Sequence, residues 1–384
     1  MNNKNNQYDI QENTAFISKN FFIDDKNKQC LQGVENIFLL YKTKIFIIFG
    51  ILVLFIIPPI GKYLEDFEIL FEKFIGMPIN RNIEIKNIGK DPNFDYFCCF
   101  CSQGRQENLY VRDLIDYYLS IGVEKFILGD NNLPNTENFS DILKDYVNKG
   151  TVDIIDLIGS SIKQAEFFYN MYEKYKNICQ WITFFDFDEY LYMIGKDQKP
   201  LSIQEFITTN NFNNCDSILF NWMMYGDNDY IYYNKRPLTE RFTKYDLSNK
   251  ANRFVKSMVR GNLTAKIFGK GLSNHIPNRY IRLCNSMGEK ADFGKDISTQ
   301  IFHINAFIMH FNTKTVEEYG KKIIRGYPGN HKEYFFDRIR LFFLYNKFSF
   351  KKLKIFEQKF NVTFVIKRKR GNIRIGFINK TKNE

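Results

Sequence analysis

The feature that most constrains the fold is an alternation of short apolar runs with helical patterns between residues 94 and 189. Four runs have the character of buried strands, and the three segments between them place apolar residues at helical spacing. Such strand–helix repetition is typical of a mostly parallel, Rossmann-like sheet with helices on both faces, so we predict an α/β fold. The predicted strands are 94–101, 125–129, 151–157 and 181–185, and the predicted helices are 107–121, 139–147 and 162–176.

Polar segments follow three of the predicted strands. Residues 102–108, 130–132 and 186–189 come directly after the first, second and fourth strands. Ligands of open α/β sheets bind beyond the carboxyl ends of the strands. We therefore expect these three segments to line one cleft.

Asp186 and Asp188 stand at the end of the fourth predicted strand. Residues i and i+2 of an extended chain point the same way, so both carboxylates can face one cation. Carboxylate oxygens suit Mg²⁺ or Mn²⁺, and substrate phosphates can supply the remaining ligands. Asp-x-Asp also occurs as an exposed acidic pair, but its place after a buried strand favours a divalent metal that neutralises a departing diphosphate.

Other motif-based functions lack residues that they require. Glu189 and Tyr190 follow the pair, where an EF-hand would have Gly and further acidic residues. The sequence contains no glycine-rich nucleotide-binding motif and no G-x-S-x-G. A phosphatase with a nucleophilic Asp would have a small residue and Thr after the pair. A metal-dependent phosphotransferase remains a distant alternative.

Several motifs in a fixed order resemble the glycosyltransferase family 92 domain and its family 2-like relatives. Residues 181–191 resemble the signature W-x-x-x-x-D-x-D-E-[FY]-L. Gln106 and Leu114 depart from the family, which has Asn and Trp there. The resemblance covers roughly residues 94–330, and its other matching segments are 107–115, 122–131, 221–226, 240–242, 256–275 and 310–326.

This resemblance implies a GT-A fold, a divalent metal and inverting transfer of a sugar, often galactose, from a UDP-sugar donor to a glycan or glycoconjugate acceptor. Glu107 and Asp130 would contact the donor nucleoside. Asp186 and Asp188 would hold the metal at the donor site, and His310 is a third candidate ligand because neutral imidazole binds such metals.

Further cations and carboxylates complete the candidate site. Lys256 and Arg260 are donor-site candidates because cations can balance the diphosphate charge, and Lys314 and Arg325 are others. The catalytic base should be a carboxylate near the acceptor hydroxyl, and Asp227 and Glu240 are the candidates. The alternative is a transferase-derived binding protein without catalysis, against which the intact Asp-x-Asp argues.

An apolar stretch precedes the predicted domain. Residues 45–61 carry no charge and are bracketed by Lys44 and Lys62. A helix of this length reaches roughly 25 Å, and residues 37–41 can extend it toward the hydrocarbon core of about 30 Å. We predict a transmembrane anchor over 37–61. The alternatives are a buried helix or a signal peptide, which would start near residue 1.

Charges beside the anchor predict its orientation. Lysines lie just before it and acidic residues lie at 65–68, so the positive-inside rule places the N-terminus in the cytosol and most of the chain across the lipid bilayer. We expect a single-pass type II protein of the Golgi or endoplasmic reticulum with a lumenal catalytic domain. Disulfides are allowed there, although their pairing cannot be deduced from sequence. Because Cys98, Cys99 and Cys101 lack zinc-site spacing, we expect a buried strand there.

The remaining segments give the predicted domain boundaries. Residues 1–36 form a disordered cytosolic tail, 62–92 a stem and 93–345 the glycosyltransferase domain. Residues 346–384 form a basic C-terminal tail, since residues 351–384 carry +9 of the net charge of +11. The rest of the chain is nearly neutral, whereas a nucleic-acid-binding domain would carry a basic face, so we expect no nucleic-acid partner.

Overall fold

The structure, a computed structural model, describes residues 89–369 and 372–379, apart from 211, 269–272, 279, 295 and 327–334. These residues belong to one compact unit that spans residues 75–384. The predicted cytosolic tail, the anchor and nearly all of the stem lie outside the described residues. Within the described part, none of the helices has both the length and the apolar character needed to cross a membrane.

The first half of the described chain alternates strands and helices as predicted. Each of the predicted elements begins and ends within three residues of its observed bounds. They are β1 (Tyr96–Gly104), α4 (Asn108–Ser120), β2 (Lys125–Asp130), α5 (Ser140–Asn148), β3 (Val152–Asp156), α6 (Gln164–Tyr175) and β4 (Cys179–Phe184).

The second half contains elements for which no bounds were predicted. The strands are β5 (Glu189–Met193), β6 (Ser217–Met224), β7 (Val255–Arg260), β8 (Leu283–Asn285) and β9 (Ala306–His310), and the helices are α7 (Ile203–Thr209), α8 (Leu238–Arg241), the 3₁₀ turn η1 (Lys250–Arg253) and α9 (Val316–Arg325).

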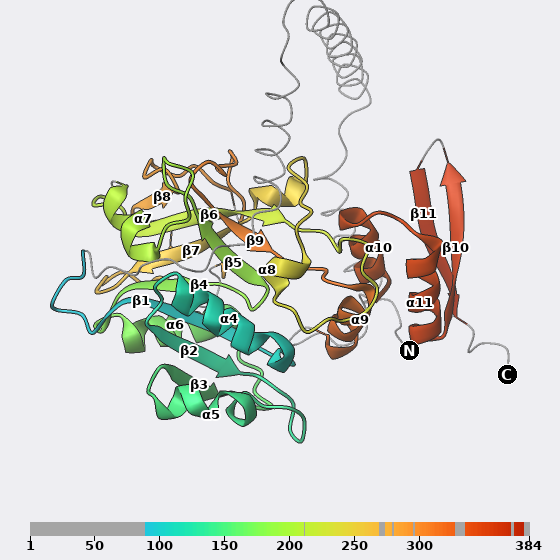
Figure 1. Cartoon of the computed structure of the whole chain (residues 1–384), viewed down its shortest axis with the longest axis horizontal. Coiled ribbons are helices and arrows are strands. Elements are labelled where there is room, and N and C mark those ends of the chain that lie inside the picture. Colours follow the sequence, from blue (N-terminus) through green and yellow to red (C-terminus); the bar gives the residue numbers. More distant parts are fainter. Residues whose placement is uncertain are drawn as a thin grey trace, which may run out of the picture. The chain divides into compact units, whose positions relative to one another are not determined.

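A nine-stranded sheet connects these elements (Figure 1). Its order is β3-β2-β1-β4-β7-β6-β9-β5, with β8 beside β6. The strands β3, β2, β1 and β4 are parallel, which fits a Rossmann-like fold. By contrast, β7 runs antiparallel to both β4 and β6, and β5 runs antiparallel to β9. The predicted α/β class is confirmed, and the parallel sheet continues into a mixed one.

Helices cover both faces of the parallel half. Along β1, Cys98 and Phe100 belong to an apolar cluster with residues of α4, whereas Cys99 and Cys101 belong to a second cluster with residues of α6. Successive strand residues point to opposite faces, so a strand buried on both faces needs an unbroken apolar run. The cysteine-rich segment is therefore a buried strand, as predicted.

Two disulfides join parts of the sheet. Cys99–Cys179 links β1 to the start of β4, and Cys215–Cys284 links the segment before β6 to β8. Cys98 and Cys101 are free and buried. Burial raises the pKa of both thiols, which disfavours the reactive thiolate.

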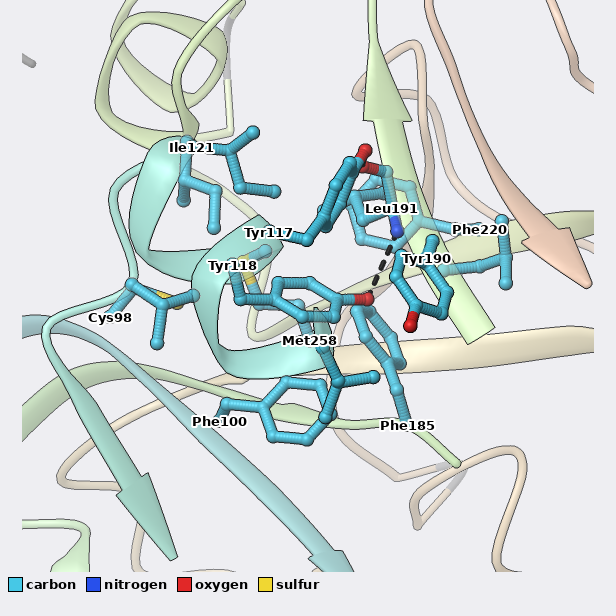
Figure 2. Packing of buried hydrophobic residues seen from close by; sticks show 14 of the residues in the cluster. Cys98, Phe100, Tyr117, Tyr118, Ile121, Phe185, Tyr190, Leu191, Phe220 and Met258 are labelled. Carbon is cyan, nitrogen blue, oxygen red and sulfur yellow. Dashed lines mark hydrogen bonds between the residues drawn. The ribbon is translucent and has the colours of Figure 1, made fainter. Parts of the chain in front are cut away.

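Two tyrosines of α4 hold the strand β5 in place. Because β5 ends the sheet order, the backbone groups on its outer side need partners other than a strand. The Tyr117 hydroxyl donates to the Leu191 carbonyl (2.7 Å), and the Tyr118 hydroxyl donates to the Glu189 carbonyl (2.9 Å) and accepts from the Leu191 N–H (3.0 Å). Figure 2 shows both rings beside Tyr190. This packing fixes β5, which directly follows the Asp-x-Asp segment.

A third apolar cluster lies at the C-terminal end of the described chain. It joins side chains of α9 with those of α10 (Phe335–Tyr345) and α11 (Phe350–Phe360), and it includes Phe364. The strands β10 (Val362–Lys369) and β11 (Asn372–Asn379) then pair as an antiparallel hairpin. Much of the segment described above as a basic tail thus forms a helix and a hairpin, and α11 packs on α9.

Candidate active site

The loops after β1 and β2 meet at the carboxyl edge of the parallel strands. β1 pairs with β2 on one side and with β4 on the other. Arg105 Nε donates to the Asn131 carbonyl (2.8 Å), and the Gln106 N–H donates to the Asn132 side-chain oxygen (2.7 Å). These bonds join two of the three polar segments that the sequence places at one edge, and the third follows the neighbouring strand β4.

Asp186, just after β4, is held by two side chains. Its Oδ2 lies 2.8 Å from Nζ of Lys256 on β7, and its Oδ1 accepts from Gln164 Nε2 at the start of α6 (2.6 Å). Lys256 is fully buried, while 33% of the Asp186 side chain is exposed. Burial alone would raise the pKa of Asp186, but the charge and the hydrogen bond of Lys256, together with His275, lower that pKa on balance. Asp186 is therefore an ionised, partly exposed carboxylate just after β4.

Asp188 lies deeper and faces three basic side chains. Its Oδ2 is 2.7 Å from Lys322 Nζ and 3.8 Å from Lys314 Nζ, and its Oδ1 is 3.7 Å from His310 Nε2. Burial would raise the pKa of Asp188, but the two lysine charges hold it well below its usual range. The structure therefore brings Asp188 and the candidate ligand His310 together.

His310 is the last residue of β9 and lies opposite Glu189 in the strand register. Its ring packs on Trp222 with the centroids 4.1 Å apart. Burial lowers the pKa of His310, which favours the neutral imidazole that binds metals. Its Nδ1 is buried without a hydrogen-bond partner among the described residues.

Glu189 is a site residue that the sequence reasoning passed over. Its side chain is fully buried, and its Oε2 accepts from the Asp186 N–H (2.8 Å) and lies 3.6 Å from Lys256 Nζ. Burial raises the pKa of Glu189 well above its usual value. The carboxyl group thus fixes the turn between Asp186 and Asp188. Its position three residues after Asp186 is the signal that could have identified it.

A cavity of about 380 Å³ lies beside Asp188. Its lining includes Glu107, Lys314, Lys322 and Arg325. Arg325 pairs with Glu107 at the start of α4 and also donates to the Arg105 carbonyl (2.6 Å). The lining of this cavity therefore includes both residues of the loop after β1 and lysines that face Asp188.

The helix α9 supplies two of these cations. It starts with a capping box in which the Thr315 hydroxyl and the Glu318 carboxylate bond each other's backbone N–H. Lys322 and Arg325 are three residues apart and so lie on one face of the helix. The T-x-x-E pattern at Thr315 and Glu318 is a sequence signal for the start of this helix. Counting helical turns from that start would have added Lys322 to the predicted cations.

Asp130 has a structural role in the loop after β2. Its carboxylate accepts from the Asn132 N–H (3.2 Å), from the Asn132 side-chain amide (2.7 Å) and from the Phe139 N–H (2.7 Å). Only 2% of Asp130 is exposed. The contact with a nucleoside that the family resemblance implied for Asp130 would therefore compete with bonds inside its own loop.

Arg260 does not join the carboxylates. It lies opposite Trp181 in the register of β7 and β4, with its guanidinium 4.3 Å from the Trp181 ring, and it donates to the Cys215 and Phe212 carbonyls. Because β7 is antiparallel to β4, Arg260 lies at the end of β4 remote from Asp186. The direction of one strand thus separates Arg260 from the candidate site.

The two candidate bases also lie elsewhere. Asp227 follows β6, and its carboxylate forms a buried ion pair with Lys352 of α11 (2.7 Å). Glu240 is exposed on the short helix α8. Neither is among the residues that contact Asp186 or Asp188 in the described part of the chain.

Comparison with known proteins gives one family. Residues 94–284 match the model described as Glycosyltransferase family 92. No curated protein matches the chain. The matched stretch contains β1 to β7 with Asp186, Asp188 and Lys256, while β9 and α9, which carry His310 and Lys322, lie beyond it.

Proposed function

Residues 94–284 form a glycosyltransferase family 92 domain, and from that premise we propose that this chain transfers a sugar, galactose in the first instance, from a UDP-sugar to a hydroxyl of a glycan or glycoconjugate. An acceptor oxygen forms a bond to the anomeric carbon while the bond to the UDP oxygen breaks. The acceptor proton passes to a base, and the anomeric configuration inverts. The proposal includes a GT-A-type arrangement of the sheet.

One observation carries this proposal. Asp186 and Asp188 follow β4 at the carboxyl edge of the parallel strands, and the cavity of about 380 Å³ beside Asp188 is lined by Lys314, Lys322 and Arg325. Cations around a concave site attract a diphosphate, and Arg and Lys form charge-assisted hydrogen bonds with its oxygens. The arrangement therefore suits a donor whose leaving group is UDP.

A metal fits part of this site. Among the described residues, no three His, Cys, Asp or Glu side chains form a group that could hold a metal by themselves. Asp188 and His310 nevertheless offer a carboxylate and a neutral imidazole 3.7 Å apart. We propose that these two residues, with Asp186 nearby, hold Mn²⁺ or Mg²⁺ and that donor phosphates supply the other ligands. When bound, the cation would neutralise charge on the leaving diphosphate.

The protein's own cations have defined tasks in this proposal. Lys256 keeps Asp186 ionised and oriented, since its ammonium group is buried between Asp186 and Glu189. Lys314 and Lys322 would bind diphosphate oxygens from the cavity beside Asp188. The Thr313 hydroxyl also lines this cavity and has no hydrogen-bond partner among the described residues, so it is a candidate donor to the same oxygens.

Turnover of a UDP-sugar tests the proposed reaction. The detergent-solubilised full chain should release UDP from one member of a panel of UDP-sugars, and EDTA should abolish the release until Mn²⁺ is restored. Binding of a UDP-sugar without turnover in any condition would instead indicate the catalytically inactive binding protein. Release of UMP in place of UDP would indicate a phosphotransferase, which breaks the bond between the two donor phosphates and transfers the sugar phosphate.

We propose that the catalytic domain is lumenal in the Golgi or endoplasmic reticulum, with residues 37–61 as a signal anchor in the lipid bilayer. The two disulfides support this, because such bonds persist in oxidising compartments.

Protease added to intact microsomes should remove only the N-terminal tail. When the chain is unfolded and alkylated without prior reduction, the reagent should label Cys98 and Cys101. It should not label the four cysteines of the two disulfides. Digestion of the large fragment in intact microsomes would contradict the orientation.

A further inference from the structure

A second cavity, of about 420 Å³, lies at the loop that joins β6 to α8. Three tyrosines in close succession line it, Tyr230, Tyr232 and Tyr233, together with Asn234 and Arg236. A volume of this size lies within the range of small-molecule sites, which combine aromatic walls with a few polar groups. None of these residues belongs to the candidate active site described above.

Exposure alternates along this loop. Tyr230 and Tyr232 are 41% and 69% exposed, whereas Ile231 and Tyr233 between and after them pack against two of the apolar clusters. The two partly buried residues anchor the loop, and the rings of Tyr230 and Tyr232 remain exposed. Neighbouring exposed aromatic rings at a hollow mark a surface for a ligand, because they present rigid area that is apolar on the ring and polar at the hydroxyl.

The start of this loop is a turn that Lys352 holds in place. Asn228 and Asp229 have φ angles of 49° and 64°, in the left-handed region that Asn and Asp adopt more readily than other residues apart from glycine. The Nζ of the buried Lys352 of α11 lies 2.7 Å from Asp227 and 2.8 Å from Asp229, and these ion pairs fix the turn.

The helix α9 holds the same loop from its other end. The Glu317 N–H donates to the Ile231 carbonyl (2.9 Å), and the Glu317 carboxylate accepts from the Tyr233 N–H (2.9 Å). Both ends of the tyrosine segment are therefore fixed by hydrogen bonds or ion pairs. A site held in this way loses little conformational entropy when a ligand binds.

One ion pair connects this cavity to the one beside Asp188. Arg241 lines the tyrosine cavity, with its guanidinium 5.3 Å from the Tyr233 ring centroid. The same guanidinium donates two hydrogen bonds, of 3.0 and 2.9 Å, to Glu318, which lines the cavity of about 380 Å³. The two cavities thus share a wall formed by Arg241 and Glu318.

We propose that the tyrosine cavity is an acceptor subsite that binds a saccharide unit. A sugar ring has one apolar C–H face and a rim of hydroxyls, which matches two exposed tyrosine rings beside Asn234 and Arg236. The role as acceptor subsite rests on the proposed glycosyltransferase function, whereas saccharide binding itself does not. The subsite depends on α11, which lies outside the stretch that matches the family model.

The test compares the wild-type full chain with three single variants on a glycan array. The wild type should bind at least one immobilised glycan, and Tyr232→Ala should weaken that binding about tenfold, the effect expected for loss of one aromatic contact. Tyr232→Trp should keep the binding because it keeps a stacking surface. Tyr280→Ala is the matched control, since Tyr280 is 89% exposed and does not line the cavity. It should bind like the wild type.

Kinetics separate this inference from the proposed function. With the glycan identified on the array as acceptor, Tyr232→Ala should raise the acceptor KM about tenfold and leave acceptor-independent hydrolysis of the UDP-sugar unchanged. Absence of glycan binding by the wild type, or equal binding by Tyr232→Ala, would overturn the subsite. Glycan binding that depends on Tyr232, without any UDP-sugar turnover, would keep the subsite and reject the transferase.

Discussion

Asp188→Asn is expected to lower kcat/KM for sugar transfer by about 10²–10³, the loss that follows removal of one preorganised electrostatic contact. The substitution keeps the size of the side chain and one oxygen, but it removes the charge that faces His310, Lys314 and Lys322. Mn²⁺ affinity, measured directly by electron paramagnetic resonance, should fall in parallel. Partial recovery of the rate at high Mn²⁺ would show that the lost charge normally contributes to binding the metal ion.

The control for this substitution is another ion-paired aspartate. Asp145 on α5 pairs with Arg112 (2.8 Å), and both side chains are about half exposed. Asp145→Asn should leave both the rate and the Mn²⁺ affinity unchanged, because surface ion pairs contribute little. If Asp188→Asn retains near-normal, metal-dependent transfer, the Asp-x-Asp segment is not the site and the proposed mechanism is wrong.

Glu318→Ala is expected to destabilise the folded state by about 3–5 kcal/mol, the cost of leaving one partner of a buried ion pair alone. The side chains of Arg241 and Glu318 are 2% and 0% exposed. Glu318 also accepts from the Tyr110 hydroxyl (2.9 Å) and closes the capping box of α9. Chemical denaturation of the variant at pH 7 measures the loss directly.

A double variant separates the ion pair from packing. Arg241→Met with Glu318→Leu should recover much of the lost stability, because apolar side chains of similar volume can replace a buried pair. Glu173→Ala, which removes a surface partner of Lys176, should cost well under about 1 kcal/mol. An equally unstable double variant would show that packing or capping, and not the unpaired charge, causes the loss.

The stability that the Arg241–Glu318 ion pair contributes should change with pH in a predictable direction. Burial would raise the pKa of Glu318, but its hydrogen bonds and ionic contact with Arg241 lower it below the unfolded value. The stability that this carboxylate contributes is therefore present above its unfolded pKa and is lost as the pH falls through the folded pKa. The stability difference between wild type and Glu318→Ala should narrow as the solution becomes acidic.

Local sequence patterns determined the first half of the fold and the centre of the candidate site. The apolar run of β1 predicts a strand buried on both faces because each face requires its own apolar residues. The place of Asp186 and Asp188 after β4 also follows from the sequence, since alternating strands and helices put their carboxyl ends at one edge. These features depend on residues that are neighbours along the chain.

Contacts between distant segments were decided only by the tertiary structure. β7 enters the sheet antiparallel to β4, which brings Lys256 to Asp186 and leaves Arg260 beside Trp181 at the other end. A parallel β7 would have reversed these positions. Lys256 and Arg260 lie on the same strand. No local pattern in the sequence indicates whether that strand runs parallel or antiparallel to its neighbours.

Long-range contacts also explain where the other site residues lie. Lys322 of α9 pairs with Asp188, and Lys352 of α11 pairs with Asp227 after β6, although the partners of each pair lie far apart in the sequence. Disulfide pairing follows from strand neighbours in the same way. Local propensity predicts which residues form an element, whereas long-range packing, which depends on the whole core, decides which side chains meet.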